Sequence, residues 1–193
     1  MLVIGNGESR KGINIDLLAG PKIGCNAIYR DFKVQHLVCV DKRMMSEVID
    51  AGVNNDSLIY TRKDWYSQFN LKRIRTVPRL PYAGMDRPDN PIHWGSGPYA
   101  VLLGALKSKE RNIRMIGFDL YSSDSKINNI YKSTKNYEAA EKSAIDPRYW
   151  IYQIGKVFEC FPLVNFTIYQ KDNWQMPKSW KHRHVKVDKL ENI

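Results

Sequence analysis

The chain has 193 residues, of which 43% are hydrophobic and 26% are charged, and its formal net charge is +10. These totals are ordinary for a globular protein of one domain, which can bury roughly 70% of its unfolded surface. The sequence contains no run of about 18 apolar residues, which excludes a transmembrane helix. It enters a strand-like run at once and shows no signal-peptide pattern, so we expect a cytoplasmic protein.

The positive charge predicts attraction to polyanions, namely nucleic acid, a nucleotide, or an anionic membrane or glycan surface. A basic surface that is merely solvated is the plain alternative. The cysteines Cys25, Cys39 and Cys160 lack the spacing of metal ligands. Their odd number in an intracellular chain indicates buried free thiols, so we expect neither a metal site nor a catalytic cysteine.

The first predicted strand covers residues 2–4 and is broken at once by Gly5 and Gly7. A strand, a glycine turn and a helix form the arrangement with which α/β folds present backbone N–H groups to a phosphate. Ser9 is expected to cap the next turn or to bind the phosphate. The dinucleotide fingerprint G-x-G-x-x-G is incomplete because Arg10 holds its third glycine position, so a plain tight turn is the alternative.

The apolar runs predict strands, in chain order, over residues 22–25, 37–41, 57–60, 73–77, 113–117 and 163–169. Helices are predicted over residues 13–18, 44–51, 99–109 and 146–161. Asn26 ends one strand, and asparagine tolerates the left-handed conformation that such a turn uses. Asp146 and Pro147 are expected to be the N-cap and the first residue of the last helix.

Two long segments separate these elements. Residues 78–98 are rich in proline and glycine, which rules out regular structure, and loops of this length are usually functional. At their end Ser96 or Gly97 is expected to cap the following helix. Residues 122–145 are polar and their Glu/Ala/Lys end favours a helix; Asn129 and Tyr131 are predicted to form a lid over a ligand, with disordered surface as the alternative.

Alternation of strands and helices predicts an α/β fold, a single-domain Rossmann-like and mostly parallel sheet with helices on both faces. We expect a nucleotide-binding domain over residues 1–172 and a basic C-terminal tail over residues 173–193. Ligands bind such sheets at the carboxyl ends of the strands. Polar side chains follow the predicted strands at those ends, at Asn6, Asn26, Asp41 and Asp119.

Five short motifs share an order and spacing with a known family. They are Gly5-Asn6-Gly7-x-Ser9, Cys25-Asn26, Asp41, Gly95-Ser96-Gly97 and Gly117-Phe118-Asp119-Leu120-Tyr121. Together they resemble the bacterial sialyltransferases that use CMP-sialic acid, and a wider group that includes archaeal 6-hydroxymethylpterin pyrophosphokinases. The resemblance covers about residues 1–121 well, and the final helix and strand loosely.

The resemblance implies a glycosyltransferase that moves a sugar from a nucleotide-activated donor to a hydroxyl of a glycan or another acceptor, with no required cofactor. It implies that nucleotide and donor are bound by Gly5, Asn6, Gly7, Ser9, Asn26, Ser96, Gly97, Gly117, Asp119 and Tyr121. Backbone donors, hydroxyls and a helix N-terminus can stabilise a departing phosphate without a metal.

Two departures from the family leave the chemistry open. Asp41 stands where the sialyltransferases have asparagine, and residues 134–146 lack the histidine that serves them as general base. The candidate catalytic residues are therefore Asp41, Asp119 and His93, the last being the histidine nearest in sequence to Ser96.

These departures favour two alternatives. One is a pyrophosphokinase-like enzyme that uses ATP and magnesium, with Asp41 and Asp119 holding the metal. The other is a non-catalytic protein that binds a nucleotide, or binds nucleic acid through the basic tail, where Trp174 and Trp180 lie among the cations. A second basic group over residues 62–79 also suits a phosphate-rich acceptor, although a solvated face is the alternative for both groups.

Overall fold

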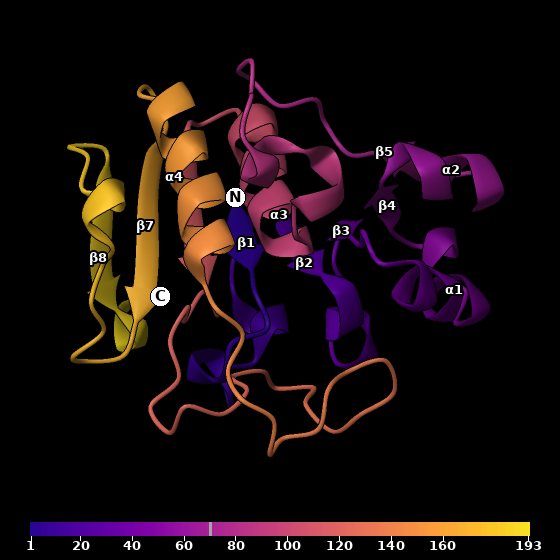
Figure 1. Cartoon of the computed structure of the whole chain (residues 1–193), viewed down its shortest axis with the longest axis horizontal. Helices are drawn as coiled ribbons and strands as arrows, with labels where there is room; N and C mark the ends of the chain where they lie inside the picture. The colour runs from indigo at the N-terminus through magenta and orange to yellow at the C-terminus, as the bar shows by residue number, and fades with distance from the viewer. Residues whose placement is uncertain (70) are drawn as a thin grey trace.

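The computed structural model describes residues 1–69 and 71–193 and arranges them around one sheet of eight strands (Figure 1). The strand order is β5-β4-β3-β2-β1-β6-β7-β8, and every neighbouring pair is parallel. The predicted α/β Rossmann-like architecture is therefore confirmed. The chain builds outward from β1 to β5 and then returns to the other side of β1 with β6, which places a topological switch point between β1 and β6.

The strands are β1 (Leu2–Ile4), β2 (Lys22–Cys25), β3 (His36–Val38), β4 (Leu58–Thr61), β5 (Ile74–Thr76), β6 (Asn112–Ile116), β7 (Asn165–Gln170) and β8 (Val185–Lys189). The helices are α1 (Lys42–Asp50), α2 (Lys63–Phe69), α3 (Ser96–Lys107) and α4 (Arg148–Cys160). None of the helices in the described ranges is long and apolar enough to cross a bilayer.

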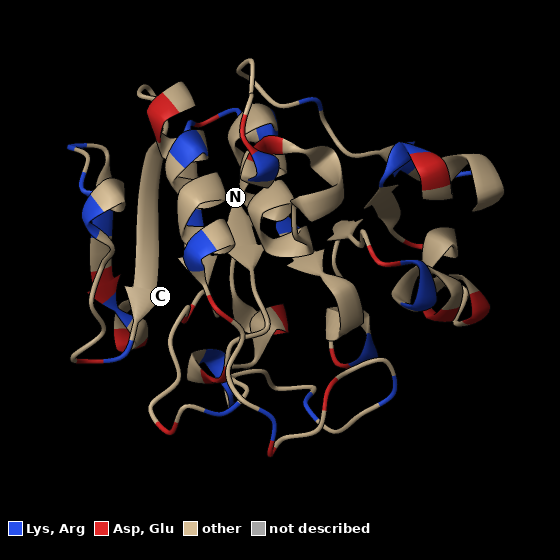
Figure 2. Cartoon of the chain, viewed as in Figure 1, with Lys and Arg blue, Asp and Glu red and all other residues tan. Residues whose placement is uncertain are grey.

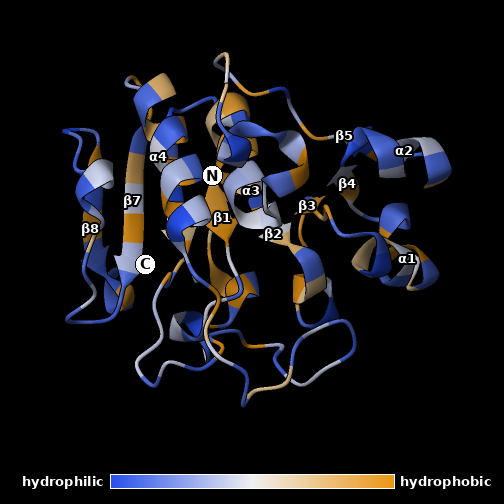
Figure 3. Cartoon of the chain, viewed as in Figure 1, coloured by the Kyte–Doolittle hydropathy of each residue, from blue (hydrophilic) through white to orange (hydrophobic). Residues whose placement is uncertain are grey.

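Two apolar layers enclose the sheet. Val3 points toward α3 and α4, whereas its neighbours Leu2 and Ile4 point toward α1, because successive side chains of a strand alternate between the two faces. All three are fully buried, as expected for a central parallel strand that is covered on both faces. Figure 3 accordingly shows β1 in hydrophobic colours along its length.

Local predictions differ from the structure where the sequence pattern is weak. The helix predicted over residues 13–18 is one 3₁₀ turn, Ile15–Leu17, in which the Asn14 side chain accepts a hydrogen bond from the N–H of Asp16. Residues 122–145 contain no helix and hold one isolated bridge between Lys126 and Ser143. Their Glu/Ala/Lys end is exposed, and a short stretch without an apolar face to bury gains too little from packing to form a helix.

The predicted helix caps are each displaced by one residue. α3 begins at Ser96 with Gly95 as its N-cap, and α4 begins at Arg148 with Pro147 as its N-cap. Asp146 still contributes, because its carboxylate accepts a hydrogen bond from the N–H of Arg148 at 2.9 Å. Helix α2 was not predicted at all.

The C-terminal segment is part of the sheet, which corrects the expectation of a tail over residues 173–193. β8 pairs with β7 along its whole length, from Phe166↔Val185 to Gln170↔Lys189. Trp180 is fully buried against Phe158 and donates from its indole N–H to the carbonyl oxygen of Ile151 at 2.8 Å. Because β8 alternates valine with charged residues, the sequence has no apolar run there from which the strand could be predicted.

Candidate functional site

A cavity of about 330 Å³ lies at the carboxyl edge of the sheet, among the segments that follow β1, β2, β3 and β6. Its volume is in the range of small-molecule sites, and it lies at the switch point between β1 and β6. Most of the predicted site residues line it, namely Gly5, Asn6, Gly7, Asn26, Asp41, Ser96, Gly97, Gly117, Asp119 and Asn129. The predicted residues that do not line it are Ser9, His93, Tyr121 and Tyr131.

The first glycine loop is shaped by the loop after β6. The N–H of Gly5 donates to the carbonyl oxygen of Ile116 at 2.8 Å, and the N–H of Gly7 donates to that of Gly117 at 2.9 Å. A Cβ atom on Gly5 would overlap the carbonyl oxygen of Gly117, and one on Gly7 would overlap the carboxylate of Asp119, each at under 3.0 Å. These N–H groups are therefore used inside the protein, contrary to the expectation that they face a phosphate.

Ser9 and Asp119 form a buried pair beside this loop. The backbone N–H of Ser9 donates to Oδ2 of Asp119 at 2.8 Å, and the Ser9 hydroxyl donates to Oδ1 at 2.5 Å. The backbone oxygen of Asp119 accepts a hydrogen bond from the indole N–H of Trp174 at 2.7 Å. Both oxygens of the Asp119 carboxylate are thus engaged, so this residue joins the loops after β1 and β6, and Ser9 neither caps a turn nor faces the cavity.

We expect the substitution Gly5→Ala to destabilise the protein by about 3 kcal/mol, because the added methyl group has to displace backbone. The matched control is Gly97→Ala, which also changes the cavity wall, but whose added Cβ would meet only the ring of Phe118 at 3.6 Å. Chemical denaturation of both variants measures the difference. Equal free energies of unfolding for the two variants would contradict the close approach of the two loops.

Arg10 is the main site residue that the sequence did not predict. It was noted only because it stands where the dinucleotide fingerprint has its third glycine. Its side chain is 2% exposed, and its Nε donates to the carbonyl oxygen of Gly5 at 2.7 Å. Its terminal nitrogen donates to Oδ1 of Asn6 at 3.3 Å and to the hydroxyl of Tyr131 at 3.1 Å. The Asn6 amide in turn donates to the carbonyl oxygen of Cys25 at 3.0 Å, so its side chain is held by protein groups.

The segment that carries the predicted lid residues is packed onto the loops beneath it. The N–H of Ile130 donates to the carbonyl oxygen of Asn6 at 2.9 Å, and the buried Tyr131 donates to Asp31 at 2.6 Å. Burial raises the pKa of Tyr137 to about 12, so its phenol stays protonated while it accepts hydrogen bonds from Asn6 and from the N–H of Ala27. In this structure Asn129 therefore belongs to a fixed cavity wall, and Tyr131 anchors that wall from behind.

Ser96 joins three elements at the centre of the cavity wall. Its hydroxyl donates to Oδ1 of Asn26 at 2.8 Å and accepts a hydrogen bond from the N–H of Val40 at 3.2 Å. Asn26 has the left-handed φ of 50° that its residue type allows. Among the described residues, the N–H groups of Ser96 and Gly97 have no hydrogen-bond partner. The wall therefore presents the positive end of the α3 dipole, which suits an anionic group.

Asp41 supplies the carboxylate with spare acceptor capacity. It is the N-cap of α1, where its Oδ1 accepts a hydrogen bond from the N–H of Met44 at 3.1 Å. Its side chain is 55% exposed, and Nε of Arg43 lies 3.9 Å from the same oxygen. Within the described residues Oδ2 has no hydrogen-bond partner, in contrast to both oxygens of Asp119. Asp41 can therefore cap α1 with Oδ1 and accept a hydrogen bond from a ligand in the cavity with Oδ2.

The described residues bring no histidine to the cavity wall. His93 lies in the 3₁₀ turn Pro91–His93, where its ring packs edge-on against Tyr149 with centroids 6.0 Å apart. His184 contacts the carbonyl oxygen of Phe158 at 3.0 Å, near the C-terminal end of α4 and far from the carboxyl edge. Tyr121 is exposed beside the cavity.

The side of the cavity toward α4 is apolar, lined by Phe118, Leu120, Ile127, Trp150 and Ile154. No Lys or Arg of the described chain lines the cavity. Burial raises the pKa of Cys25 to about 12, so this thiol in the wall stays neutral and is not a nucleophile. The cavity thus has a polar half near β2 and β3 and an apolar half near β6 and α4.

The two carboxylates of the pyrophosphokinase alternative differ in the hydrogen bonds that they accept. Asp119 uses both oxygens for Ser9. In the described part of the chain, no group of three or more His, Cys, Asp or Glu side chains lies close enough to share a metal ion.

No family model, no curated protein and no solved structure matches this chain. The resemblance to the sialyltransferases therefore rests on the five sequence motifs alone.

Proposed function

We propose that this chain is a glycosyltransferase-like enzyme that binds a nucleotide-activated sugar in the carboxyl-edge cavity and transfers the sugar to a hydroxyl acceptor. The observation that carries the proposal is the N-terminus of α3, whose unpaired N–H groups face a cavity of nucleotide-compatible size beside Asp41. The five ordered motifs support it, because they supply much of the cavity wall.

The two halves of the cavity suit the two parts of such a donor. The leaving phosphate lies at the N–H groups of Ser96 and Gly97, where the helix dipole stabilises the charge that develops on it. The nucleoside packs on the apolar side formed by Phe118 and Trp150. The sugar then lies in the polar half, near Asn26 and Asp41.

In the transfer step Asp41 acts as the general base. Its free Oδ2 takes the proton of the acceptor hydroxyl as the acceptor oxygen bonds to the anomeric carbon. The bond from that carbon to the phosphate oxygen breaks, and its electron pair leaves with the nucleotide. Because the acceptor enters opposite the leaving group, the configuration at the anomeric carbon inverts.

The direct test is to measure the binding of CMP, UDP, GDP and their sugar derivatives by thermal unfolding and by calorimetry. We expect one nucleotide to stabilise the protein by about 2.7 kcal/mol at a concentration of 100 times its Kd. In the variant Ala144→Trp a bulky side chain on the cavity wall occupies space in the cavity, so we expect this stabilisation to be lost. The control Ala139→Trp changes an exposed residue outside the cavity and is expected to keep it. Absence of binding by every nucleotide would refute the proposal.

The alternatives gain no specific support. In the described chain no three possible metal ligands lie together to support the pyrophosphokinase, and the basic C-terminal residues lie on the connection into β8 and on that strand rather than over the cavity. Unchanged nucleotide affinity in the presence of a chelator is the expected result.

A further inference from the structure

A group of cations lies beside the cavity at the starts of two neighbouring helices. Lys42 and Arg43 begin α1, directly after Asp41, and Arg62 and Lys63 stand at the start of α2. Figure 2 shows both helix starts in blue. Because β3 and β4 are parallel neighbours, the segments that follow them emerge at the same edge of the sheet. We call Lys42, Arg43, Lys63 and Arg79 the cationic margin.

Trp65 ties the two helix starts to the cavity wall. Its indole N–H donates to the carbonyl oxygen of Val40 at 2.9 Å, and Val40 lines the cavity. Nζ of Lys42 lies 5.4 Å from the Trp65 ring centroid, and the guanidinium carbon of Arg62 lies 5.0 Å from it. Lys42 and Arg62 thus both contact an indole ring that is hydrogen-bonded to a residue of the cavity wall.

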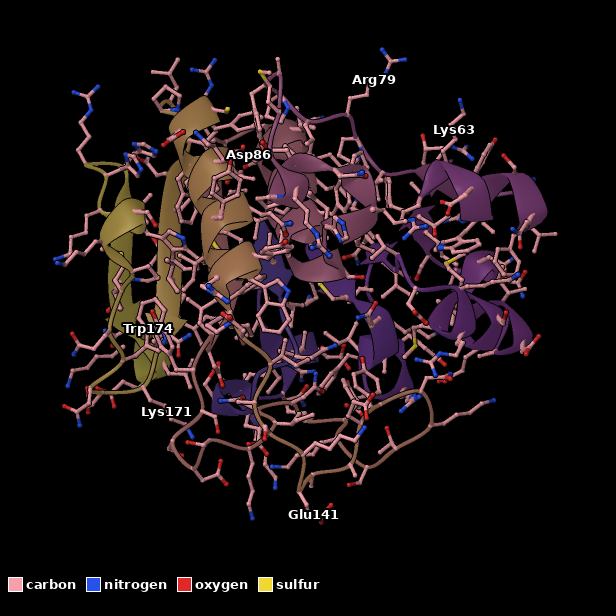
Figure 4. The ribbon with its side chains drawn as sticks, viewed as in Figure 1. Lys63, Arg79, Asp86, Glu141, Lys171 and Trp174 are labelled. Carbon is pink, nitrogen blue, oxygen red and sulfur yellow. The ribbon has the colours of Figure 1, made fainter. Side chains whose placement is uncertain are left out.

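The margin continues along the sheet edge to Arg79. The N–H of Val77 donates to the carbonyl oxygen of Thr61 at 2.7 Å, which brings the chain after β5 alongside the start of α2. Figure 4 shows Lys63 and Arg79 on one margin of the molecule, both pointing away from its body.

Few carboxylates oppose these cations. Arg62 pairs with Asp64, and Arg43 lies near Asp41, 3.9 Å from its carboxylate. Lys42, Lys63 and Arg79 are exposed and form no ion pair with any described residue. A net positive strip therefore follows the carboxyl ends of β3, β4 and β5, and it begins next to the cavity residue Asp41.

We propose that the cationic margin binds the phosphate backbone of a nucleic acid. The positive groups follow an edge instead of converging on one point, which suits a polymer with regularly spaced phosphates better than a single small anion. Lys42 and Arg62 lie over the Trp65 ring, so that ring is not free to stack on a base. Binding is therefore insensitive to sequence and falls steeply with salt.

Lys63 and Arg79 belong to the basic group over residues 62–79 that the sequence indicated, whereas the second basic group that it indicated lies elsewhere. The basic residues from Lys178 to Lys186 lie on the connection into β8 and on that strand, at the opposite edge of the sheet from β5. They have no place beside the cavity. They do offer a control of equal charge for the test.

The test compares two variants that each lose four positive charges. One is Lys42→Gln, Arg43→Gln, Lys63→Gln and Arg79→Gln; the control is Lys178→Gln, Lys181→Gln, Arg183→Gln and Lys186→Gln. Fluorescence anisotropy with a short labelled DNA duplex gives the affinity over a range of salt concentrations. We expect the margin variant to bind about tenfold or more weakly at low salt, with a slope of log K against log salt reduced by about 0.9 for each phosphate contact removed.

Several outcomes would overturn the inference. These are equal losses in the two variants, affinity of the unmodified protein that does not depend on salt, or a sulfated polysaccharide that displaces the duplex at lower concentration than unlabelled DNA. Arg62 is left unchanged so that Asp64 keeps its partner, and thermal unfolding checks that both variants fold. Nucleotide binding in the cavity is measured on the same variants and is expected to persist, so failure of the nucleic-acid surface is distinguishable from failure of the proposed transferase site.

Discussion

The substitution Asp41→Asn is expected to slow sugar transfer by about 10²- to 10⁴-fold and to leave nucleotide affinity and stability almost unchanged. Asparagine caps a helix about as well as aspartate, so α1 keeps the hydrogen bond from the N–H of Met44. Only the basic oxygen that receives the acceptor proton is lost. The experiment measures nucleotide release and product formation with the donor that binds, alongside the Kd of that donor.

Two further variants distinguish loss of the general base from loss of the helix cap and from loss of a negative charge. Asp41→Ala also removes the cap and is expected to cost about 1 kcal/mol of stability in addition to the rate. Asp50→Asn removes an exposed carboxylate at the other end of the same helix and is expected to have neither effect. A transfer rate in Asp41→Asn equal to that of the unmodified protein would remove Asp41 from the mechanism.

Truncation after residue 172 is expected to abolish cooperative folding. The deleted segment contains Trp180, which is 0% exposed, and loss of one such buried side chain alone costs about 3–5 kcal/mol. It also contains β8, without which β7 becomes an open sheet edge. Since the free energy of unfolding of a domain is about 5–15 kcal/mol, the truncated chain retains too little of it to fold cooperatively.

Circular dichroism during thermal unfolding measures this loss. The control keeps the strand and removes only charge, through Lys186→Gln and Lys189→Gln on exposed positions of β8. A truncated chain with the midpoint of the full chain would mean that residues 173–193 are the separate tail that the sequence suggested.

The sheet centre was predictable because its strands are short apolar runs. β1 consists of three buried apolar residues, and β2 and β6 each hold buried apolar residues close together, so an apolar pattern marks all three strands. β8 lacks this signal, because it lies at an edge and alternates Val185 and Val187 with lysine and aspartate. Helix α2 has no fully buried residue, and its contacts, the bond from Trp65 to Val40 and the packing of Tyr66 and Phe69 on the core, are long-range contacts that no local pattern encodes.

The position of the site was predictable for a topological reason, whereas its contacts were not. Polar residues after parallel strands meet at one edge, which placed Asn26, Asp41 and Ser96 correctly around one cavity. A glycine that accommodates a ligand and one that accommodates a neighbouring loop have the same sequence signature, since both positions require the absence of a Cβ atom. Gly5 belongs to the second kind because Gly117 lies against it.

The position of β1 in the middle of the sheet has a consequence for the order of folding. β1 can pair with β2 after about twenty residues have been made, but its other edge waits for β6, where Leu2 pairs with Arg114. Contacts between such distant residues close slowly because of the entropy of the intervening loop. The cavity wall needs strands on both sides of β1, and Trp174, which donates a hydrogen bond to Asp119 in that wall, belongs to the last tenth of the chain. Ligand binding during refolding should therefore appear late and report completion of the whole sheet, after much of the helical signal has already returned.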